Sequence, residues 1–304
     1  MKKKLLMPTL MGLSATAYAQ NTGNAKASKI YVRAGGTYAF PHAGQTSIDQ
    51  TQFLQGKFQT TETPTSGPDP IYTYSWDLKK ASFGGGITAG IAGGYMFTNH
   101  LGVEVAASIG LSQKKYNFND ALTYQSPGTG TINDHVKGTF YQKTPVLIMP
   151  SVILQTGGRK INVYSRIGIA LPVAGKFIMD YERYAFATAG SILYSWSYET
   201  KTRFALGLQG ALGAQVRIAN KISFYVEANG VSLNAYAKSR TMTKYSEDGV
   251  DYMYLLTPYE KEVQYDFTGT GTSPNPSTTV PKQAATFSIA YSNIGIGAGL
   301  AFDL

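Results

Sequence analysis

The chain has 304 residues, with 27 Lys and Arg against 18 Asp and Glu, a formal net charge of +9, 33 Gly, 22 Tyr and no Cys. Charged residues make up 15% of the chain, well below the ~25% of an ordinary soluble domain, although the apolar share of 43% is too small for a helical membrane protein. No stretch reaches the ~18 consecutive apolar residues of a spanning helix, and the lack of Cys excludes disulfide scaffolds, thiolate metal sites and cysteine nucleophiles.

The N-terminal segment has the pattern of a cleaved signal peptide. Residues 2–4 are lysines, residues 5–13 are mostly apolar, and residues 17–19 (Ala-Tyr-Ala) form a small-x-small cleavage site. We therefore predict that residues 1–19 are removed and that residues 20–304 form one exported domain. An exported protein rarely meets nucleic acid, so the basic charge does not indicate a nucleic-acid partner.

Period-2 alternation of apolar and small or polar residues follows along the whole chain and predicts β-strands. For example, Phe83, Ile87 and Ile91 fall on one face of a segment whose other face is mostly Gly and other small residues. Three short turns rich in Gly or Asn join six of these segments into hairpins. The alternating segments are residues 29–40, 81–97, 101–112, 141–155, 161–177, 203–218, 222–237 and 284–304.

The connections between these segments are of two kinds. Three are short turns, whereas residues 41–80, 119–137, 180–201 and 239–282 form long links. This sorting is typical of a transmembrane barrel with short periplasmic turns and long outer loops. Lipid offers no hydrogen-bond partner to the backbone, so strands can cross a membrane only as a closed sheet.

We predict an all-β fold, an antiparallel up-and-down transmembrane β-barrel of eight strands, with both termini in the periplasm. Residues 52–60 and 71–77 could form a further hairpin, which would give ten strands.

The signal peptide, the three tight hairpins and the final strand resemble the small OmpA/OmpX-type outer-membrane β-barrel domain family of Gram-negative bacteria. The last ten residues, Gly295–Leu304, alternate apolar and small residues like the C-terminal assembly signal of that family. The aromatic residue that usually ends the signal is Phe302 here, two positions before the end. The resemblance implies a bacterial outer-membrane location and the barrel-assembly machinery as a transient partner, without naming a function.

Five charged residues fall on the face that points into the predicted barrel: Arg33, Glu104, Arg166, Arg217 and Glu227. Each lies near a short turn or near the start of the first strand, so we expect them in the periplasmic half of the lumen. Buried charges persist when they are paired and hydrogen-bonded, which predicts an ion-pair network. The network could gate an ion or proton path, but eight strands leave room only for side chains, which favours a plug. Inward-facing Gly and Ala either make space for these side chains or leave a small cavity.

A second charged set falls at the loop-side ends of the predicted strands. In the barrel topology it forms a basic rim, and Lys and Arg bind phosphate groups such as those of lipopolysaccharide by charge-assisted hydrogen bonds. The alternative is that strand ends are simply polar. The residues of this basic rim are Lys114, Lys115, Lys176, Arg203, Lys238 and Arg240.

Aromatic residues gather in the third long link, among them Tyr181, Trp196 and Tyr198. Tyr and Trp are favoured both in binding surfaces and in the aromatic girdles of membrane barrels. The cluster therefore indicates either a recognition surface or a membrane interface.

The sequence contains few residues in an arrangement typical of catalysis or metal binding. His42, His100 and His135 are the three histidines, and none has metal-ligand spacing. His42 and His135 are candidates for a lipid-modifying enzyme, but neither belongs to a His-x-Ser pair. We expect no catalytic, metal or cofactor site.

The favoured function is a structural or surface-interaction role, with outer-membrane lipid and lipopolysaccharide as surroundings and an extracellular ligand bound by the loops. The first alternative is a narrow transport channel for a small solute. The second is a lipid-modifying barrel enzyme.

Overall fold

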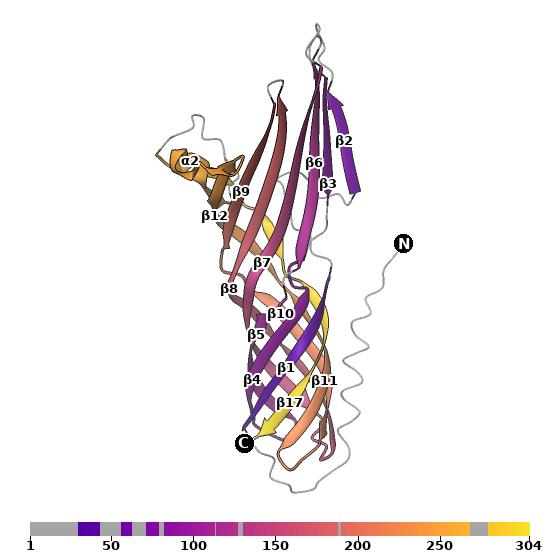
Figure 1. The fold of residues 1–304 in the computed structure, drawn as a ribbon. Coiled ribbons are helices and arrows are strands. Elements are labelled where there is room, and N and C mark those ends of the chain that lie inside the picture. The colour runs from indigo at the N-terminus through magenta and orange to yellow at the C-terminus, as the bar shows by residue number, and fades with distance from the viewer. Residues whose placement is uncertain are drawn as a thin grey trace.

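The computed structural model of the chain describes residues 30–42, 56–62, 71–78, 82–112, 114–126, 130–187, 190–267 and 279–304. Eight antiparallel strands close into a barrel in which the last strand pairs with the first, which confirms the predicted fold (Figure 1). In order around the barrel they are β1 (Ile30–Pro41), β4 (Gly86–Met96), β5 (Leu101–Gly110), β7 (Gly130–Gln155), β8 (Ile161–Ala187), β10 (Gly207–Arg217), β11 (Ile222–Ser232) and β17 (Asn293–Asp303). The predicted signal peptide lies outside the described residues.

One end of the barrel carries the three short turns and both ends of the described chain. The backbone N–H of Leu304 donates to the carbonyl of Ile30 at 3.0 Å, and the N–H of Asp303 donates to the carbonyl of Lys221 in the turn between β10 and β11 at 2.9 Å. The start of β1 and the C-terminus therefore lie at the turn end, as an even number of strands requires.

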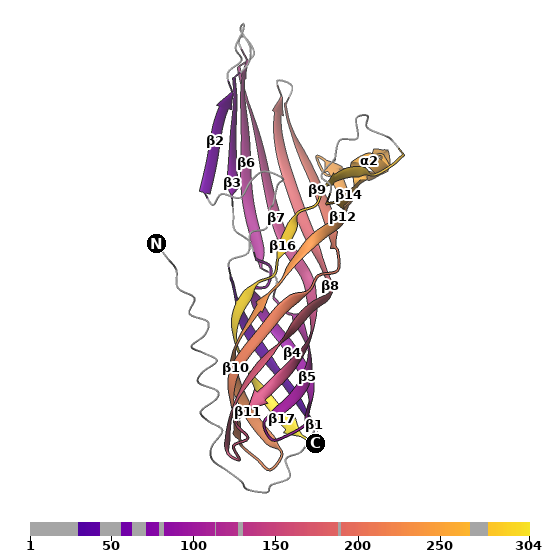
Figure 2. The same ribbon diagram turned by 180° about the vertical axis from the view of Figure 1, so that it is seen from behind.

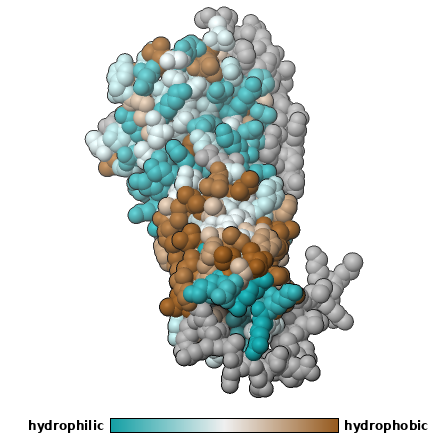
Figure 3. Space-filling view, turned by 60° about the horizontal axis from the view of Figure 1, so that its bottom comes forward, coloured by the Kyte–Doolittle hydropathy of each residue, from teal (hydrophilic) through white to brown (hydrophobic). Residues whose placement is uncertain are grey.

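The outside of the barrel is an apolar belt. Ile91 and Ile167 each remain 64% exposed and Leu208 remains 66% exposed, each on a strand whose alternate residues point inward. A space-filling view shows the apolar side chains gathered over the barrel, between a hydrophilic outer part and a hydrophilic patch at the turn end (Figure 3). Exposed patches of this extent mark an apolar partner, and a ring of them around a closed sheet fits lipid. Within the described ranges, no helix is long and apolar enough to cross a membrane.

Beyond the barrel, β7 and β8 continue without interruption into an outer sheet (Figures 1 and 2). Crossing the lipid takes only ~9–11 residues, whereas β7 has 26 and β8 has 27. On one side β7 pairs with β6 (Lys115–Ser126), β6 with β3 (Ile71–Leu78), and β3 with β2 (Gly56–Glu62). On the other side β8 pairs with β9 (Gly190–Thr202) and β9 with β12 (Asn234–Glu247).

A small lobe is attached to β12. It contains a short parallel strand pair and two single-turn helices beside the outer end of β12 (Figure 2). Its elements are β13 (Val250–Asp251), η2 (Met253–Leu255), α2 (Pro258–Lys261), β14 (Glu262–Asp266) and β15 (Lys282–Ala285). The strand β16 (Ser288–Ala290) pairs with the start of β12 and leads back into β17.

These elements correct the prediction of long outer loops. Residues 119–137 and 180–201 are mostly paired strand, because alternation continues there with aromatic and polar residues in place of aliphatic ones. The possible extra hairpin does form, as β2 paired with β3, but it belongs to the outer sheet. The barrel therefore has eight strands and not ten.

Where the barrel meets the outer sheet, β7 and β8 are irregular. The register between them shifts from Lys143 to Leu147, Thr144 has a φ of 48°, and Gly175 on β8 has a φ of 130°. Pro145 lies inside this irregular stretch, where it removes no regular ladder bond. The two strands therefore change direction at the barrel mouth.

Candidate functional site

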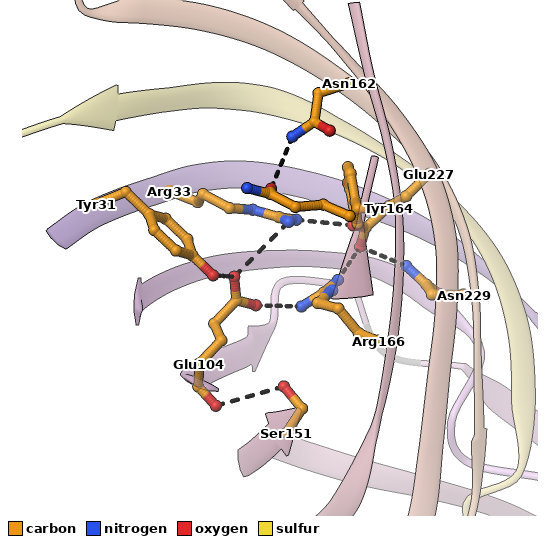
Figure 4. A network of polar contacts seen from close by, with 10 residues as sticks. Tyr31, Arg33, Glu104, Ser151, Asn162, Tyr164, Arg166, Glu227 and Asn229 are labelled. Carbon is orange, nitrogen blue, oxygen red and sulfur yellow. Dashed lines mark hydrogen bonds and ion pairs between the residues drawn. The ribbon is translucent and has the colours of Figure 1, made fainter. Parts of the chain in front are cut away.

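Four charged side chains meet inside the barrel (Figure 4). Each is within six residues of the turn-side end of its strand, so they lie in the turn-side half. Arg33 Nη2 lies 2.7 Å from Glu227 Oε2, and Arg33 Nη1 lies 3.7 Å from Glu104 Oε2. Arg166 joins the same two carboxylates: its Nη1 contacts Glu104 Oε1, and its Nη2 lies 2.5 Å from Glu227 Oε1. The four side chains are between 0% and 8% exposed. Two arginines thus neutralise two glutamates, which is how buried charges persist.

The barrel order explains why these four side chains reach one another. Arg33 is on β1, Glu104 on β5, Arg166 on β8 and Glu227 on β11, so they come from every second strand around the barrel. The intervening strands mostly place small residues beside them. The paired neighbours on those strands include Ala92, Gly94, Ser151, Ala211, Gly213, Gly297 and Ala301.

Tyrosines complete the network, and sequence reasoning missed them. Tyr31 donates its hydroxyl to Glu104 Oε2 at 2.9 Å, and Tyr164 donates to Glu227 Oε2 at 2.7 Å. The guanidinium carbon of Arg33 lies 4.1 Å from the ring centre of Tyr225. The sequence did contain an indication of them, because each tyrosine precedes a charged member of the network by two residues and therefore points to the same inward face. The name charged plug is used below for Arg33, Glu104, Arg166 and Glu227.

Arg217 is not part of this network, which corrects the fifth predicted member. Its Nη2 lies 2.6 Å from Asp303 Oδ2, and its side chain is 47% exposed. Arg217 is the last residue of β10, so although its parity is inward, its position is the open turn end of the barrel.

The outer end of the barrel is filled by a second, apolar cluster. Phe83, Phe177 and Tyr291 are buried there and pack edge to face, with ring centres 4.9 Å apart for Phe83 and Phe177 and 5.4 Å apart for Phe177 and Tyr291. The prediction that Phe83 shares the outward face of Ile87 and Ile91 is therefore wrong, because Phe83 lies before β4 begins at Gly86. Gln142 donates its Nε2 to the Tyr291 hydroxyl at 2.7 Å. This aromatic plug also includes Leu233 and Ile289 and continues onto Phe118 and Phe140 of the outer sheet.

Between the two plugs the lumen contains a cavity of about 110 Å³. Arg33, Arg166 and Glu227 line it on the turn side, and Leu147 and Asn293 are among the residues at its outer side. Both expectations for the inward small residues are therefore met, because they make room for the charged plug and leave a cavity beside it.

The basic rim falls where the strands leave the apolar belt, but its members do not all face outward. Lys114, Lys115 and Lys238 are exposed, and Lys176 pairs with Glu199 at 2.9 Å. The lysine ammonium groups of Lys114 and Lys115 also lie over the rings of neighbouring tyrosines.

Arg203 and Arg240 correct the prediction of an outward basic rim. Arg203 donates to the carbonyl of Tyr265 and lies over the ring of Phe267. Arg240 lies 4.4 Å from the ring centre of Tyr198 on the inner face of the outer sheet. A β-bulge between Ala237 and Ser239 on β12 changes the strand phase and turns Arg240 inward.

The described residues contain no group of three or more His, Asp and Glu side chains arranged to hold a metal ion. His100 lies in a short turn, with Nδ1 3.1 Å from the carbonyl oxygen of Gln155. His42 follows β1, and His135 is exposed on β7 within the outer sheet.

A comparison with protein families agrees with this architecture. The family profile described as outer membrane protein beta-barrel domain matches residues 5–254. Two solved structures align over most of the chain. The outer membrane protein OprG of Pseudomonas aeruginosa is 13% identical, with 92% of this chain and 97% of that chain covered and a TM-score of 0.39. The outer membrane protease OmpT of Escherichia coli is 9% identical, with 93% and 99% covered and a TM-score of 0.34. No curated protein matches the chain.

Proposed function

Because the chain belongs to the outer membrane protein β-barrel family, we propose that it is a non-conducting outer-membrane barrel that anchors an external sheet for surface interaction. In this proposal the short turns and both termini face the periplasm, and the outer sheet projects from the cell. The outer part of β7, residues 130–145, extends roughly 50 Å at ~3.3 Å per residue. A long part of this strand therefore forms a surface that lipid does not contact.

The observation that carries the proposal is that the lumen is filled at two levels. The charged plug is 0% to 8% exposed at the turn side, and the aromatic plug fills the outer end. An eight-stranded barrel has an interior just wide enough for side chains, so two filled layers support a lumen without a continuous aqueous path. The part of the protein that offers a surface to other molecules is then the outer sheet.

Single-channel recording in planar lipid bilayers tests this proposal. The purified barrel should insert without producing current steps, with insertion verified by flotation of proteoliposomes and detection verified with a general porin in the same bilayer. Reproducible steps from the inserted wild-type barrel would contradict it.

A narrow transport channel is the second candidate, and the cavity between the plugs is the observation that favours it. Gln209 lines this cavity, is 6% exposed, and its Nε2 has no hydrogen-bond partner in the described part of the chain. The same recordings decide between the two candidates.

We also propose that the exposed lysines of the basic rim contact lipopolysaccharide phosphates. Replacing Lys114, Lys115 and Lys238 by Gln should remove most of the rise in unfolding temperature that lipopolysaccharide gives over phosphatidylcholine, because a ligand bound only to the folded state stabilises it. The matched control replaces three exposed basic residues, Arg159, Lys160 and Lys221, at the turn end, where lipopolysaccharide does not reach. An equal rise in both variants would refute the contact.

The proposal assigns a binding role and no catalysis. The mass spectrum of lipid A should be the same in cells with and without the overexpressed protein, and a new acylation state would contradict this part of the proposal.

The C-terminal strand, with Ile294 and Ile296 exposed on its outer face, is the segment that the assembly machinery would bind during insertion.

A further inference from the structure

We propose that the inner face of the outer sheet binds a neutral glycan. This inference rests on the proposed surface role and names its ligand class. The inner face is the side of the sheet that continues the barrel lumen, and Phe140 and Met179 of the aromatic plug stand at its base.

Above the plug, this face is a row of aromatic rings from neighbouring strands. Strand register places Tyr181 of β8 beside Trp196 of β9, and Trp196 beside Tyr245 of β12. The Tyr181 and Trp196 rings are parallel within 7°, with centres 5.2 Å apart, and Tyr198 stands edge-on to Tyr181 at 5.9 Å. All four rings are partly exposed. Together they are called the aromatic face below.

Polar groups with defined positions border these rings. Asp134 accepts from Arg183 Nε at 2.7 Å through Oδ2, and Tyr245 donates to Glu247 Oε1 at 2.7 Å. Asp134 is only 9% exposed, yet its second carboxylate oxygen, Oδ1, has no hydrogen-bond partner in the described residues. The Nε of Arg240, above Tyr198, is likewise buried and unpartnered among them. The inner face thus offers a ligand an acceptor beyond the rings, at Asp134, and a donor at their base, at Arg240.

The charge of this face selects the ligand class. Among the side chains that the structure describes, strand parity places three carboxylates, Asp120, Asp134 and Glu247, and two guanidiniums, Arg183 and Arg240, on it. With no excess of positive charge, the face does not favour phosphate or sulfate. A sugar ring supplies an apolar face for stacking on aromatic rings, and its hydroxyl groups both donate and accept hydrogen bonds. A neutral oligosaccharide therefore suits the rings, the Asp134 acceptor at the outer end of the face and the Arg240 donor at its base.

The outer sheet has an open edge from which a ligand can reach the aromatic face. In the described residues β2 pairs only with β3, so the outer sheet is open at that edge and does not close into a second barrel (Figure 2). An extended oligosaccharide can approach from the open side, whereas the barrel below is filled.

Tryptophan fluorescence gives a direct test, because the chain has only two Trp, Trp76 and Trp196. In a Trp76→Phe background, the full barrel in lipid nanodiscs is titrated with chitohexaose and with maltohexaose to about 10 mM. At least one of these neutral hexasaccharides should shift or quench the Trp196 emission. Tyr181→Ala and, as a variant that preserves size, Asp134→Asn should each weaken the binding by about tenfold. Tyr254→Ala, which alters a ring that is 75% exposed outside the aromatic face, should leave it unchanged.

Heparin hexasaccharide and spermine serve as charged probes. Absence of binding by both neutral sugars, binding of only a charged probe, or full retention of sugar binding in Asp134→Asn would overturn the inference. This test and the bilayer recordings can fail independently. A barrel that conducts and binds sugar would refute the proposed function and support this inference. A barrel that does not conduct and binds no sugar would support the non-conducting barrel and overturn this inference.

Discussion

Replacing Arg33 by Met tests whether the charged plug stabilises the barrel as a balanced set. Arg33 contacts Glu227 at 2.7 Å and Glu104 at 3.7 Å, and its side chain is 5% exposed. Its removal leaves two buried glutamates with Arg166 as their one arginine partner, an excess of one negative charge. Breaking a buried ion pair by removing one partner costs about 3–5 kcal/mol, so the free energy of unfolding should fall by that amount.

Arg217→Met is the matched control. Arg217 also pairs with one carboxylate at short range, at 2.6 Å from Asp303, but its side chain is 47% exposed. Exposed ion pairs contribute about 0–1 kcal/mol. The same substitution in the same barrel should therefore cost at least about 2 kcal/mol more at position 33 than at position 217.

The measurement is equilibrium unfolding in guanidinium chloride with the barrel in lipid vesicles, read by circular dichroism, with the slope of the transition checked to be unchanged. A double variant, Arg33→Met with Glu227→Gln, removes one charge of each sign and leaves Arg166 paired with Glu104. Its cost should be smaller than the sum of the two single costs, since the residues belong to one network. The reasoning would be refuted by equal losses in the two arginine variants, or by strict additivity in the double variant.

Two further predictions concern packing and pH. A Cβ at Gly94 would lie 2.2 Å from the Tyr31 ring, whereas one at Gly93 would have nothing within 4 Å. In the same unfolding assay, Gly94→Ala should lower the free energy of unfolding by about 1–3 kcal/mol, and Gly93→Ala should leave it nearly unchanged. A larger loss in Gly93→Ala than in Gly94→Ala would contradict the packing. In the outer sheet, burial and the hydrogen bond to Glu247 raise the pKa of Tyr245 from 10.0 to about 12. The folded state therefore holds a proton that the unfolded state loses, and this stabilising contribution, complete below pH 10.0, is lost as the pH rises through about 12. Tyr245→Phe should lose stability less steeply across that window, and an unchanged slope in that variant would argue against the shift.

The barrel and most of the charged plug could be predicted from the sequence because both follow from strand parity. Once the apolar face is assigned to lipid, Arg33, Glu104, Arg166 and Glu227 must point inward, and their distance from the short turns places them at one level. Arg217 has the same parity but ends its strand. Parity gives the direction of a side chain, whereas enclosure depends on where the strand stops.

The outer sheet could not be predicted in the same way. Its outward face does not contact lipid, so that face is not required to be apolar and gives no clear alternation. Trp196 and Tyr198 alternate with Ser197 and Glu199 as a strand requires, but an aromatic and charged composition is equally typical of a loop. The inward turn of Arg240 depends on a bulge in β12, and bulges insert one residue without a fixed sequence signature. Only the pairing partners on neighbouring strands decide these features.

The junction between barrel and outer sheet links the two halves of the molecule. Gly175 has a φ of 130°, a conformation that L side chains rarely adopt, and a Cβ there would lie 2.6 Å from Gln142 Nε2. That same Nε2 holds the Tyr291 hydroxyl of the aromatic plug at 2.7 Å. The bend that directs β7 and β8 away from the barrel is therefore packed against the plug that fills its mouth. Since both strands run unbroken through this bend, the packing of the plug also supports the direction in which the outer sheet leaves the barrel, as the proposed surface role requires.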